Sequence, residues 1–400
     1  MNILENGFLD EFKRAQQNLA INEANGRTGF ANNGLPGQVA LPIFDAAFGA
    51  RGSQAALPAN QAFTNGNFIS DLRLGEAGRL ATRLATSQTY LCRMVGNTFN
   101  PCAARNYNAA GPYAMNFFMV NPYAVSGLTV VDDDGWSAYQ GLQLQFRRRY
   151  ANWLTANVNY TLAKNTGNIY ADNATQSGNY TTLRNKAMND GPAPFDLRHV
   201  LQAYGTYDLP FGRGRAVEID NKVWDALGGG WTFGAVLTAQ SGTPFRLTSG
   251  RQTVNGSDSG VVLMNGHTVE ELQRLITIRP HPTQAFSRYW AAEQLIGPDG
   301  AANPEYLAPP TTPGEFGQII YLRGRNIWTL DASLNKSTSL VGRSNITVHF
   351  TIQNLLNHAV WSTPGFLGTV DITSTTFGIT NNPINNATPR NIYSRVTITF

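Results

Sequence analysis

The feature that most constrains this chain is an alternation of apolar and polar residues that begins near Trp136 and continues to the C-terminus. In NITVHFTIQN, for example, Ile346, Val348, Phe350 and Ile352 alternate with threonine, histidine and glutamine. A period of two places successive side chains on opposite faces of a β-strand. The pattern occurs in seven segments, which span residues 141–149, 153–164, 200–209, 231–240, 327–335, 345–354 and 395–400. Seven amphipathic strands are therefore expected.

The polar faces of these segments are mostly neutral glutamine, asparagine and threonine. Only 14% of the chain is charged, whereas soluble globular proteins carry about 25%. Most segments are about ten residues long, which suits a tilted strand that crosses an outer membrane. Every second connection is longer than its neighbours, as when tight turns lie at one membrane face and loops at the other. The predicted fold is all-β: a partial antiparallel meander of a transmembrane β-barrel, with long extracellular loops that carry short helices.

Aromatic residues flank several of the predicted strands. Tyr150 and Trp153 bracket the shortest connection, Phe211 and Trp231 flank the PFGRGR connection, and Phe400 ends the chain. Such rings favour the membrane–water interface, so we expect them at the periplasmic strand ends. The alternative interpretation is a soluble protein with aromatic residues at the ends of its sheet.

Three consecutive arginines, Arg147, Arg148 and Arg149, end the first predicted strand just before its tight turn. Cationic side chains at this position are expected to meet lipid head groups or the periplasmic rim rather than a substrate.

Residues 1–130 lack the alternation and form the first of two predicted regions. After Asn6, the residues Leu9, Phe12 and Leu19 share one side and Gly26 follows as a stop signal, which predicts an amphipathic helix. A second helix is expected over residues 76–87, and the remainder is expected to form long ordered loops. We therefore predict an extracellular loop region with short helices over residues 1–130, and C-terminal barrel strands over residues 131–400.

Charge and hydropathy exclude several classes of protein. The net charge of +4 is spread over 400 residues, which is too dilute to attract nucleic acid. The longest charge-free stretch, residues 106–131, is interrupted by glycine, proline and asparagine, so no transmembrane helix is expected. The start of the chain has Glu5, Asp10 and Glu11 where a signal peptide has a basic region and an apolar core. Either the chain is cytoplasmic or its true N-terminus is missing.

No motif in the sequence indicates an enzyme. HExxH, GxSxG, GxxxxGK(S/T), GxGxxG and paired CxxC are all absent, so no catalytic residue, cofactor or metal is expected. His267 and His281 share the longest loop, but solvated loop histidines are the commoner case. Asp132, Asp133 and Asp134 offer the oxygen ligands that calcium prefers, although such a run is more often a solvated turn.

The two cysteines, Cys92 and Cys102, are ten positions apart in a stretch with glycine, asparagine and proline. One interpretation is a disulfide that closes the intervening loop in an oxidising compartment. The other is a pair of unrelated thiols. The even count of cysteines and the loop-like setting favour the disulfide.

Many segments, in their order and spacing, resemble the C-terminal part of TonB-dependent outer-membrane receptors of the Oar-like type abundant in acidobacteria. These segments include ENGFLDEFKRAQQNLAIN, ANNGLPGQVALPIFDAAFG, GPYAMNFFMVNPYA, DDDGWSAYQGLQLQFRRR, FDLRHVLQAYGTYDLPFGRGR, LGGGWTFGAVLTAQSGTPF, IQNLLNHAVW and PRNIYSRVTITF. The resemblance covers almost the whole chain. It implies that Cys92 and Cys102 lie in an extracellular loop. It also implies that Val396, Ile398 and Phe400 form a terminal strand that the barrel-assembly machinery reads.

Receptors of this type resemble a closed barrel of about 22 strands with a globular plug inside it, preceded by a TonB box. Seven strands cannot close such a wall, so this chain is expected to be the C-terminal third of a longer receptor. The resemblance implies energised uptake of a siderophore, cobalamin or oligosaccharide ligand across the outer membrane of a Gram-negative bacterium. The expected partners are outer-membrane lipid, the barrel-assembly machinery, an extracellular small-molecule ligand, and the TonB complex through the missing N-terminal part.

Two other functions stay open at this point. The first is an outer-membrane structural or adhesion barrel that displays residues 1–130 and the long loop after Gln240. The second is a secreted, soluble β-protein that binds glycans, and this reading predicts solubility without detergent.

Overall fold

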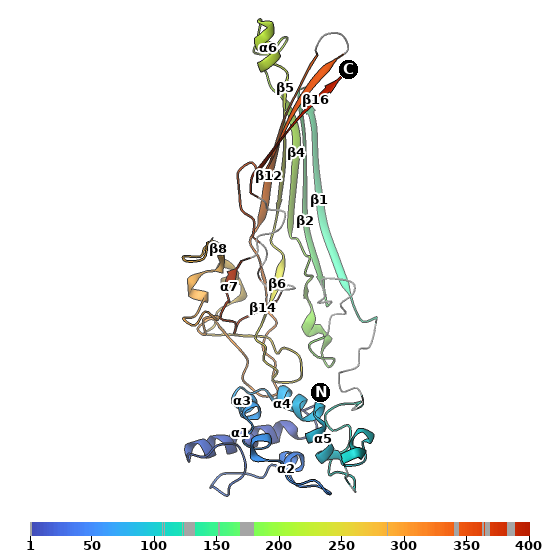
Figure 1. The fold of residues 1–400 in the computed structure, drawn as a ribbon, viewed down its shortest axis with the longest axis vertical. Coiled ribbons are helices and arrows are strands. Elements are labelled where there is room, and N and C mark those ends of the chain that lie inside the picture. The colour runs from blue at the N-terminus through green and yellow to red at the C-terminus, as the bar shows by residue number, and fades with distance from the viewer. Residues whose placement is uncertain are drawn as a thin grey trace.

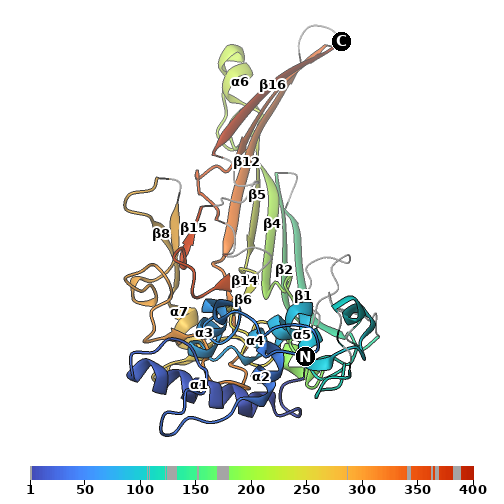
Figure 2. The ribbon, with the colours of Figure 1, turned by 60° about the horizontal axis from the view of Figure 1, so that its bottom comes forward.

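The computed structural model describes residues 2–105, 107, 109–121, 123, 133–150, 153–168, 180–285, 287–339, 344–361, 364, 369–381 and 389–400. These residues form an elongated molecule with helices at one end and a long curved sheet reaching to the other (Figure 1). A layer of short strands and loops lies between them (Figure 2). The predicted boundary after residue 130 lies outside the described residues.

The long sheet, which we call the wall, contains all seven predicted strands. They are β1 (Ser137–Tyr150), β2 (Leu154–Gly167), β4 (His199–Asp208), β5 (Trp231–Gln240), β12 (Ile327–Ser339), β13 (Asn345–Gln353) and β16 (Asn391–Thr399). Their spatial order is β1-β2-β4-β5-β12-β13-β16 and every pairing is antiparallel. The predicted meander is therefore confirmed. The short strand β3 (Gly191–Pro192) pairs with the end of β2.

The register of the wall keeps like residues on like faces. Leu142 of β1 lies opposite Leu162 of β2 on one face, and Gln145 lies opposite Asn159 on the other. Because side chains alternate across a strand, a one-residue slip would move every apolar side chain to the polar face. The alternation in the sequence thus fixes both the strand type and the two faces, which we call the apolar face and the polar face.

The first 105 residues form a helical layer rather than mainly loops. It contains α1 (Phe8–Ala24), α2 (Pro42–Phe48), α3 (Gly66–Arg73), α4 (Ala77–Thr86) and α5 (Gln88–Val95), with 3₁₀ turns η1 (Ala59–Gln61) and η2 (Asn100–Arg105). The two predicted helices correspond to α1 and α4. The other three helices have seven or eight residues each, which is too short for a helical period to stand out in the sequence.

A cluster of aromatic side chains holds the helical layer together. Phe8, Phe30, Phe44 and Phe68 are all less than 3% exposed. The rings of Phe30 and Phe44 meet edge to face at 5.1 Å, and Phe8 meets Phe118 at the same distance. Such pairs add to the stabilisation from burial itself. The layer is therefore a packed unit with its own core, and it contains more helices than the two that the sequence predicts between long ordered loops.

The connections between the strands of the wall also contain short strands and helices. Short strands form three small sheets: β10 with β7, β11-β6-β14, and β15-β9-β8. Their bounds are β6 (Pro244–Thr248), β7 (Val262–Leu263), β8 (Ile276–Pro280), β9 (Arg288–Ala291), β10 (Leu307–Ala308), β11 (Tyr321–Arg323), β14 (Thr369–Asp371) and β15 (Ile379–Thr380). The same connections hold α6 (Lys222–Gly228), α7 (Val269–Arg274), η3 (Lys186–Asn189) and η4 (Glu293–Leu295).

This middle layer has a second core, in which the ring of Trp290 contacts Phe245 at 5.3 Å and Phe377 at 5.1 Å. Ion pairs and hydrogen bonds join it to the helical layer. Arg184 pairs with Glu5 at 2.7 Å, and the Arg79 guanidinium donates to the carbonyl of Gly250 at 2.5 Å. The prediction of an all-β fold needs correction, because a large antiparallel sheet is combined with helices. Among the described residues, no helix is both long and apolar enough to cross a membrane.

Candidate functional site

The candidate functional site is the polar face of the wall. The register aligns Thr155, Thr206, Gly234, Ser333 and Thr351 in one row across five consecutive strands. The hydroxyls of Thr155 and Thr206 hydrogen bond at 2.6 Å. Because the row contains four hydroxyls and one glycine, it forms a shallow surface that both donates and accepts hydrogen bonds.

The next row along the strands carries larger side chains, of which three are polar and one, Val236, is apolar. Asn157 lies opposite Tyr204, Tyr204 opposite Val236, and Val236 opposite Asp331. The Asp331 carboxylate accepts a hydrogen bond at 2.8 Å from the backbone N–H of Asn354, the residue that follows β13. This bond holds the carboxylate at the point where β13 leaves the wall.

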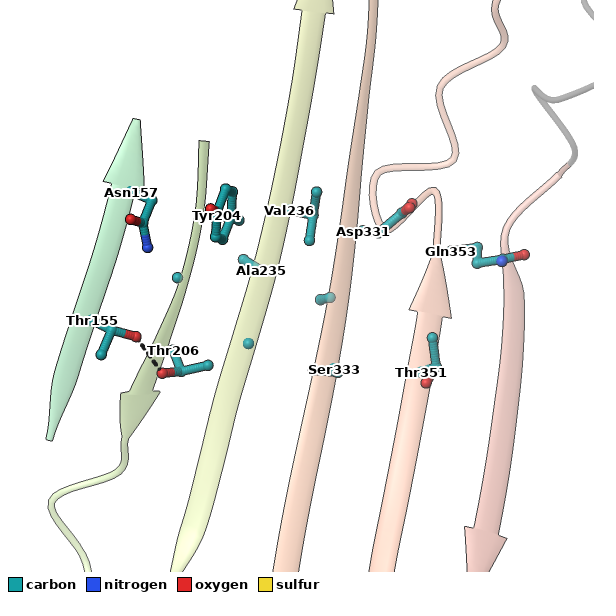
Figure 3. Close-up of a pocket in the computed structure, with 13 residues that line it drawn as sticks. Thr155, Asn157, Tyr204, Thr206, Ala235, Val236, Asp331, Ser333, Thr351 and Gln353 are labelled. Atoms are coloured by element: carbon teal, nitrogen blue, oxygen red, sulfur yellow. Dashed lines mark hydrogen bonds between the residues drawn. The ribbon is translucent and has the colours of Figure 1, made fainter. Parts of the chain in front are cut away.

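Together the two rows line a groove of about 530 Å³, to which Gln353 also contributes. Figure 3 shows these side chains on neighbouring strands and the hydrogen bond between Thr155 and Thr206. Gly234 keeps part of the groove shallow, since a Cβ there would lie 2.6 Å from the Ser333 hydroxyl. The groove offers hydroxyls, amides and one carboxylate, which suit hydrogen bonding to a polar ligand rather than covalent chemistry.

Charged side chains on the polar face lie mostly toward its sides. The face positions of β1 include Arg147 and Arg149, opposite Asn157 and Thr155 of β2. On the last strand Arg395 lies opposite His349. Arg148 belongs to the apolar face, where its guanidinium lies 5.3 Å from the ring of Tyr150. The three arginines that the sequence predicts at the rim are thus divided between the two faces.

The structure joins Cys92 and Cys102 in a disulfide with the Cα atoms 5.3 Å apart. Cys92 lies in α5 and Cys102 in η2, and both are fully buried in the core of the helical layer. The bond thus ties the last helix of the layer to the turn that follows it.

The other candidate ligands do not come together. His267 hydrogen bonds to Glu271 and stacks on Tyr306, whereas His281 accepts hydrogen bonds from its own loop and stacks on Tyr289. Across the described ranges, no group of three or more histidine, cysteine, aspartate or glutamate side chains has the geometry of a metal site.

Of the aspartate run, Asp132 lies outside the described residues. The Asp134 carboxylate forms an ion pair with Lys186, and its backbone carbonyl accepts hydrogen bonds from Asn168 and Tyr180. Asp134 is therefore already engaged by a cation of the chain itself.

The residues expected to act in assembly lie on the apolar face of β16, at one edge of the wall. Val396 is 60% exposed, Ile398 is 57% exposed and Phe400 is 98% exposed. Within the described residues, β16 pairs with β13 and with no other strand. The final strand thus combines an open backbone edge with an apolar row.

Sequence reasoning missed a charged group on the apolar face. Lys336 of β12 is only 8% exposed. Its ammonium donates to the backbone carbonyls of Asp225 and Gly229 around the C-terminus of α6, and it lies 5.6 Å from the centre of the Trp231 ring. A lysine in an apolar row is the signal that would have pointed to a covering element.

The sequence matches the family described as outer membrane beta barrel domain over residues 77–393. The match starts in the helical layer and covers the middle layer and nearly all of the wall. No curated protein matches the sequence. The long antiparallel strands, the polar groove and the opposite apolar face agree with the architecture of this family. The chain therefore belongs to the family of outer membrane β-barrel domains, and its place is the bacterial outer membrane.

Proposed function

We propose that this chain forms the C-terminal part of the barrel of a TonB-dependent outer-membrane receptor, and that it takes part in the energised uptake of a ligand of the siderophore, cobalamin or oligosaccharide class. The observation that carries the proposal is the largely uncharged groove on the polar face, in which Asp331 is the one charged lining residue. A barrel whose lumen is lined in this way passes polar ligands without trapping them by charge.

The open edges of the wall support the same proposal. Within the described residues, β1 pairs only with β2 and β16 only with β13. A strand edge exposed to hydrocarbon leaves backbone groups unsatisfied, so a stable wall in a membrane must close on itself. Further strands of a larger receptor barrel would satisfy both edges.

The proposal is tested by uptake in cells that carry or lack the gene. Radiolabelled ferric siderophore, cobalamin and an oligosaccharide are supplied separately, with and without an uncoupler of the proton-motive force. We expect uptake of one ligand that is lost both on deletion and with the uncoupler. Uptake that persists in the presence of the uncoupler would indicate a passive pore and would contradict the proposal.

A second function, surface adhesion or display, is favoured by one observation. The helical layer has its own aromatic core and disulfide and lies at the end of the molecule away from the C-terminus (Figure 1). If display is the function, cells that carry the gene should bind a surface or a partner cell through the helical layer. Deletion of the gene should then abolish adhesion and leave uptake of all three ligands unchanged.

A further inference from the structure

The connection between β4 and β5 leaves an apolar helix face uncovered. In α6, Val223 is 66% exposed, Trp224 is 65% exposed and Leu227 is 61% exposed. Leu227 is four positions after Val223 and three after Trp224, and both spacings bring side chains to the same side of a helix. Phe211 and Val217 of the same connection are 43% and 49% exposed, and a bridge pairs them. The connection thus exposes five large apolar side chains, and the three on α6 form an apolar patch.

Hydrogen bonds to backbone carbonyls of α6 and of the residue after it place this helix on the apolar side of the wall. The ammonium of Lys336, on the apolar face of β12, donates to the carbonyls of Asp225 and Gly229. The indole Nε1–H of Trp231 donates to the carbonyl of Leu227 at 3.0 Å. A cation at the C-terminal end of a helix also meets the negative end of the helix dipole. The helix is therefore held on the side of the wall that faces lipid.

The helix is also at the depth of a membrane interface. It lies beside the end of the wall where the chain terminates, far from the helical layer (Figure 1). Aromatic residues gather at the same strand ends: the ring of Trp153 contacts Tyr150 at 5.1 Å and Tyr207 at 5.6 Å. Rings of this kind mark the boundary between hydrocarbon and head groups. The short-turn end of an outer-membrane barrel is the periplasmic one.

We infer that α6 is an interfacial anchor and that its apolar side contacts phospholipid of the inner leaflet of the outer membrane. Val223, Trp224 and Leu227 enter the boundary between head groups and acyl chains, to a depth of about 5 to 10 Å, as amphipathic interfacial helices do. Phospholipid is the expected binding partner because α6 is held on the lipid-facing apolar face of the wall. The inference rests on the family and on the geometry, and it is independent of the transport function.

The test measures the surroundings of single spin labels on the protein assembled in vesicles of phosphatidylethanolamine and phosphatidylglycerol. Val223→Cys and Leu227→Cys report on the apolar side of α6. Asp220→Cys, an exposed position in the same connection, serves as the aqueous control. Phe146→Cys, on the apolar face of β1, serves as the lipid control. The native cysteines do not compete for the label because they are joined in a disulfide.

For each label, the measured quantity is the ratio of its collision rate with oxygen, which concentrates in lipid, to its collision rate with a water-soluble nickel complex. We expect this ratio to be several-fold higher for the labels at positions 223 and 227 than for the label at position 220. Their ratio should approach that of the label at position 146. Ratios equal to the aqueous control would overturn the inference. Shielding from both reagents would also overturn it, because it would mean that protein rather than lipid covers the helix. All sites are exposed, so labelling does not depend on disturbing a core.

Discussion

The side chain of Glu11 provides a sharp test of how the helical layer is stabilised. Glu11 lies on α1 and is only 3% exposed. One carboxylate oxygen accepts a hydrogen bond from the backbone N–H of Phe44, near the start of α2, at 2.8 Å. Burial raises the pKa of Glu11 from its ordinary value of 4.5 to about 7, and hydrogen bonds from the backbone of Ile43 and Phe44 oppose this rise only in part.

The direction of the pH effect follows from proton binding. Between pH 4.5 and about 7 the folded layer keeps a proton on Glu11 that the unfolded chain has released. The contribution of Glu11 to stability is therefore fully present at low pH, falls as pH rises through this window, and is constant above it. Since one pKa unit corresponds to about 1.4 kcal/mol, the raised pKa corresponds to a loss on the order of 3 kcal/mol.

Glu11→Gln removes the charge and keeps a carbonyl oxygen for the N–H of Phe44. We expect the free energy of opening of the layer in this variant to lose the pH dependence that Glu11 contributes, while the carboxyls of Asp45 and Asp71, whose pKa values burial also raises, keep theirs. The stability difference between variant and wild type should then change by about 3 kcal/mol in favour of the variant from pH 5 to pH 8. Comparing the two pH values cancels any pH-independent cost of the new amide group. The measurement is amide hydrogen exchange of α1 and α2 in the assembled protein, corrected for the intrinsic pH dependence of exchange.

Asp10→Asn is the matched control, because Asp10 is the preceding residue of α1 and is exposed. Its removal should leave the pH dependence of the wild type in place. The reasoning would be refuted if Glu11→Gln loses stability between pH 5 and pH 8 as steeply as the wild type does. Such a result would mean that the carboxyl group of Glu11 is already ionised at low pH in the folded layer.

Three further predictions concern the disulfide, the last strand and a close approach in the wall. Reducing the disulfide of Cys92 should lower the stability of the helical layer by about 2 to 3 kcal/mol for a loop of this length, seen as faster hydrogen exchange in α5; unchanged exchange would contradict this. Deleting Phe400 should reduce the amount of folded barrel in the outer membrane far more than Phe350→Ala, and equal losses would leave no special role for the terminal residue. Gly205→Ala should lower the folded yield because a Cβ there lies 2.4 Å from a backbone oxygen of β2; Gly66→Ala, with open space around it, is the control that should fold normally.

The wall was predictable because the sequence of each strand alternates according to the surroundings of its two faces. Ile346, Val348 and Phe350 must meet lipid while their neighbours meet polar surroundings, so the alternation is visible without any knowledge of the other strands. The antiparallel order followed from the connection lengths. The polar face was predictable in the same way, but the groove was not. Its rows depend on register, such as Thr155 opposite Thr206, and register between strands joined by long loops is not written in either strand.

The helical and middle layers were not predictable for a different reason. Their cores are assembled from side chains that are distant in the chain, such as Phe8 against Phe118 and Phe245 against Trp290. Apart from the predicted α1 and α4, the elements of these layers are short: α2, α3 and α5 have seven or eight residues, and the strands of the middle layer have two to five. Local periodicity carries little information over such lengths. Their stability depends on tertiary packing rather than on intrinsic propensity.

The two open edges of the wall connect the fold to assembly. Each edge of a strand buried in hydrocarbon presents backbone groups that must find partners, so β1 and β16 are the positions where further strands add. Both edges carry an exposed apolar row, with Leu142, Leu144 and Phe146 on β1 and Val396 and Ile398 on β16, and Phe400, which follows β16, is 98% exposed. An edge with an apolar row and a terminal aromatic ring can add to an existing sheet by β-augmentation and be anchored at the interface. We propose that the edge of β16 meets the assembly machinery first, and that closure of the barrel then pairs both edges with further strands.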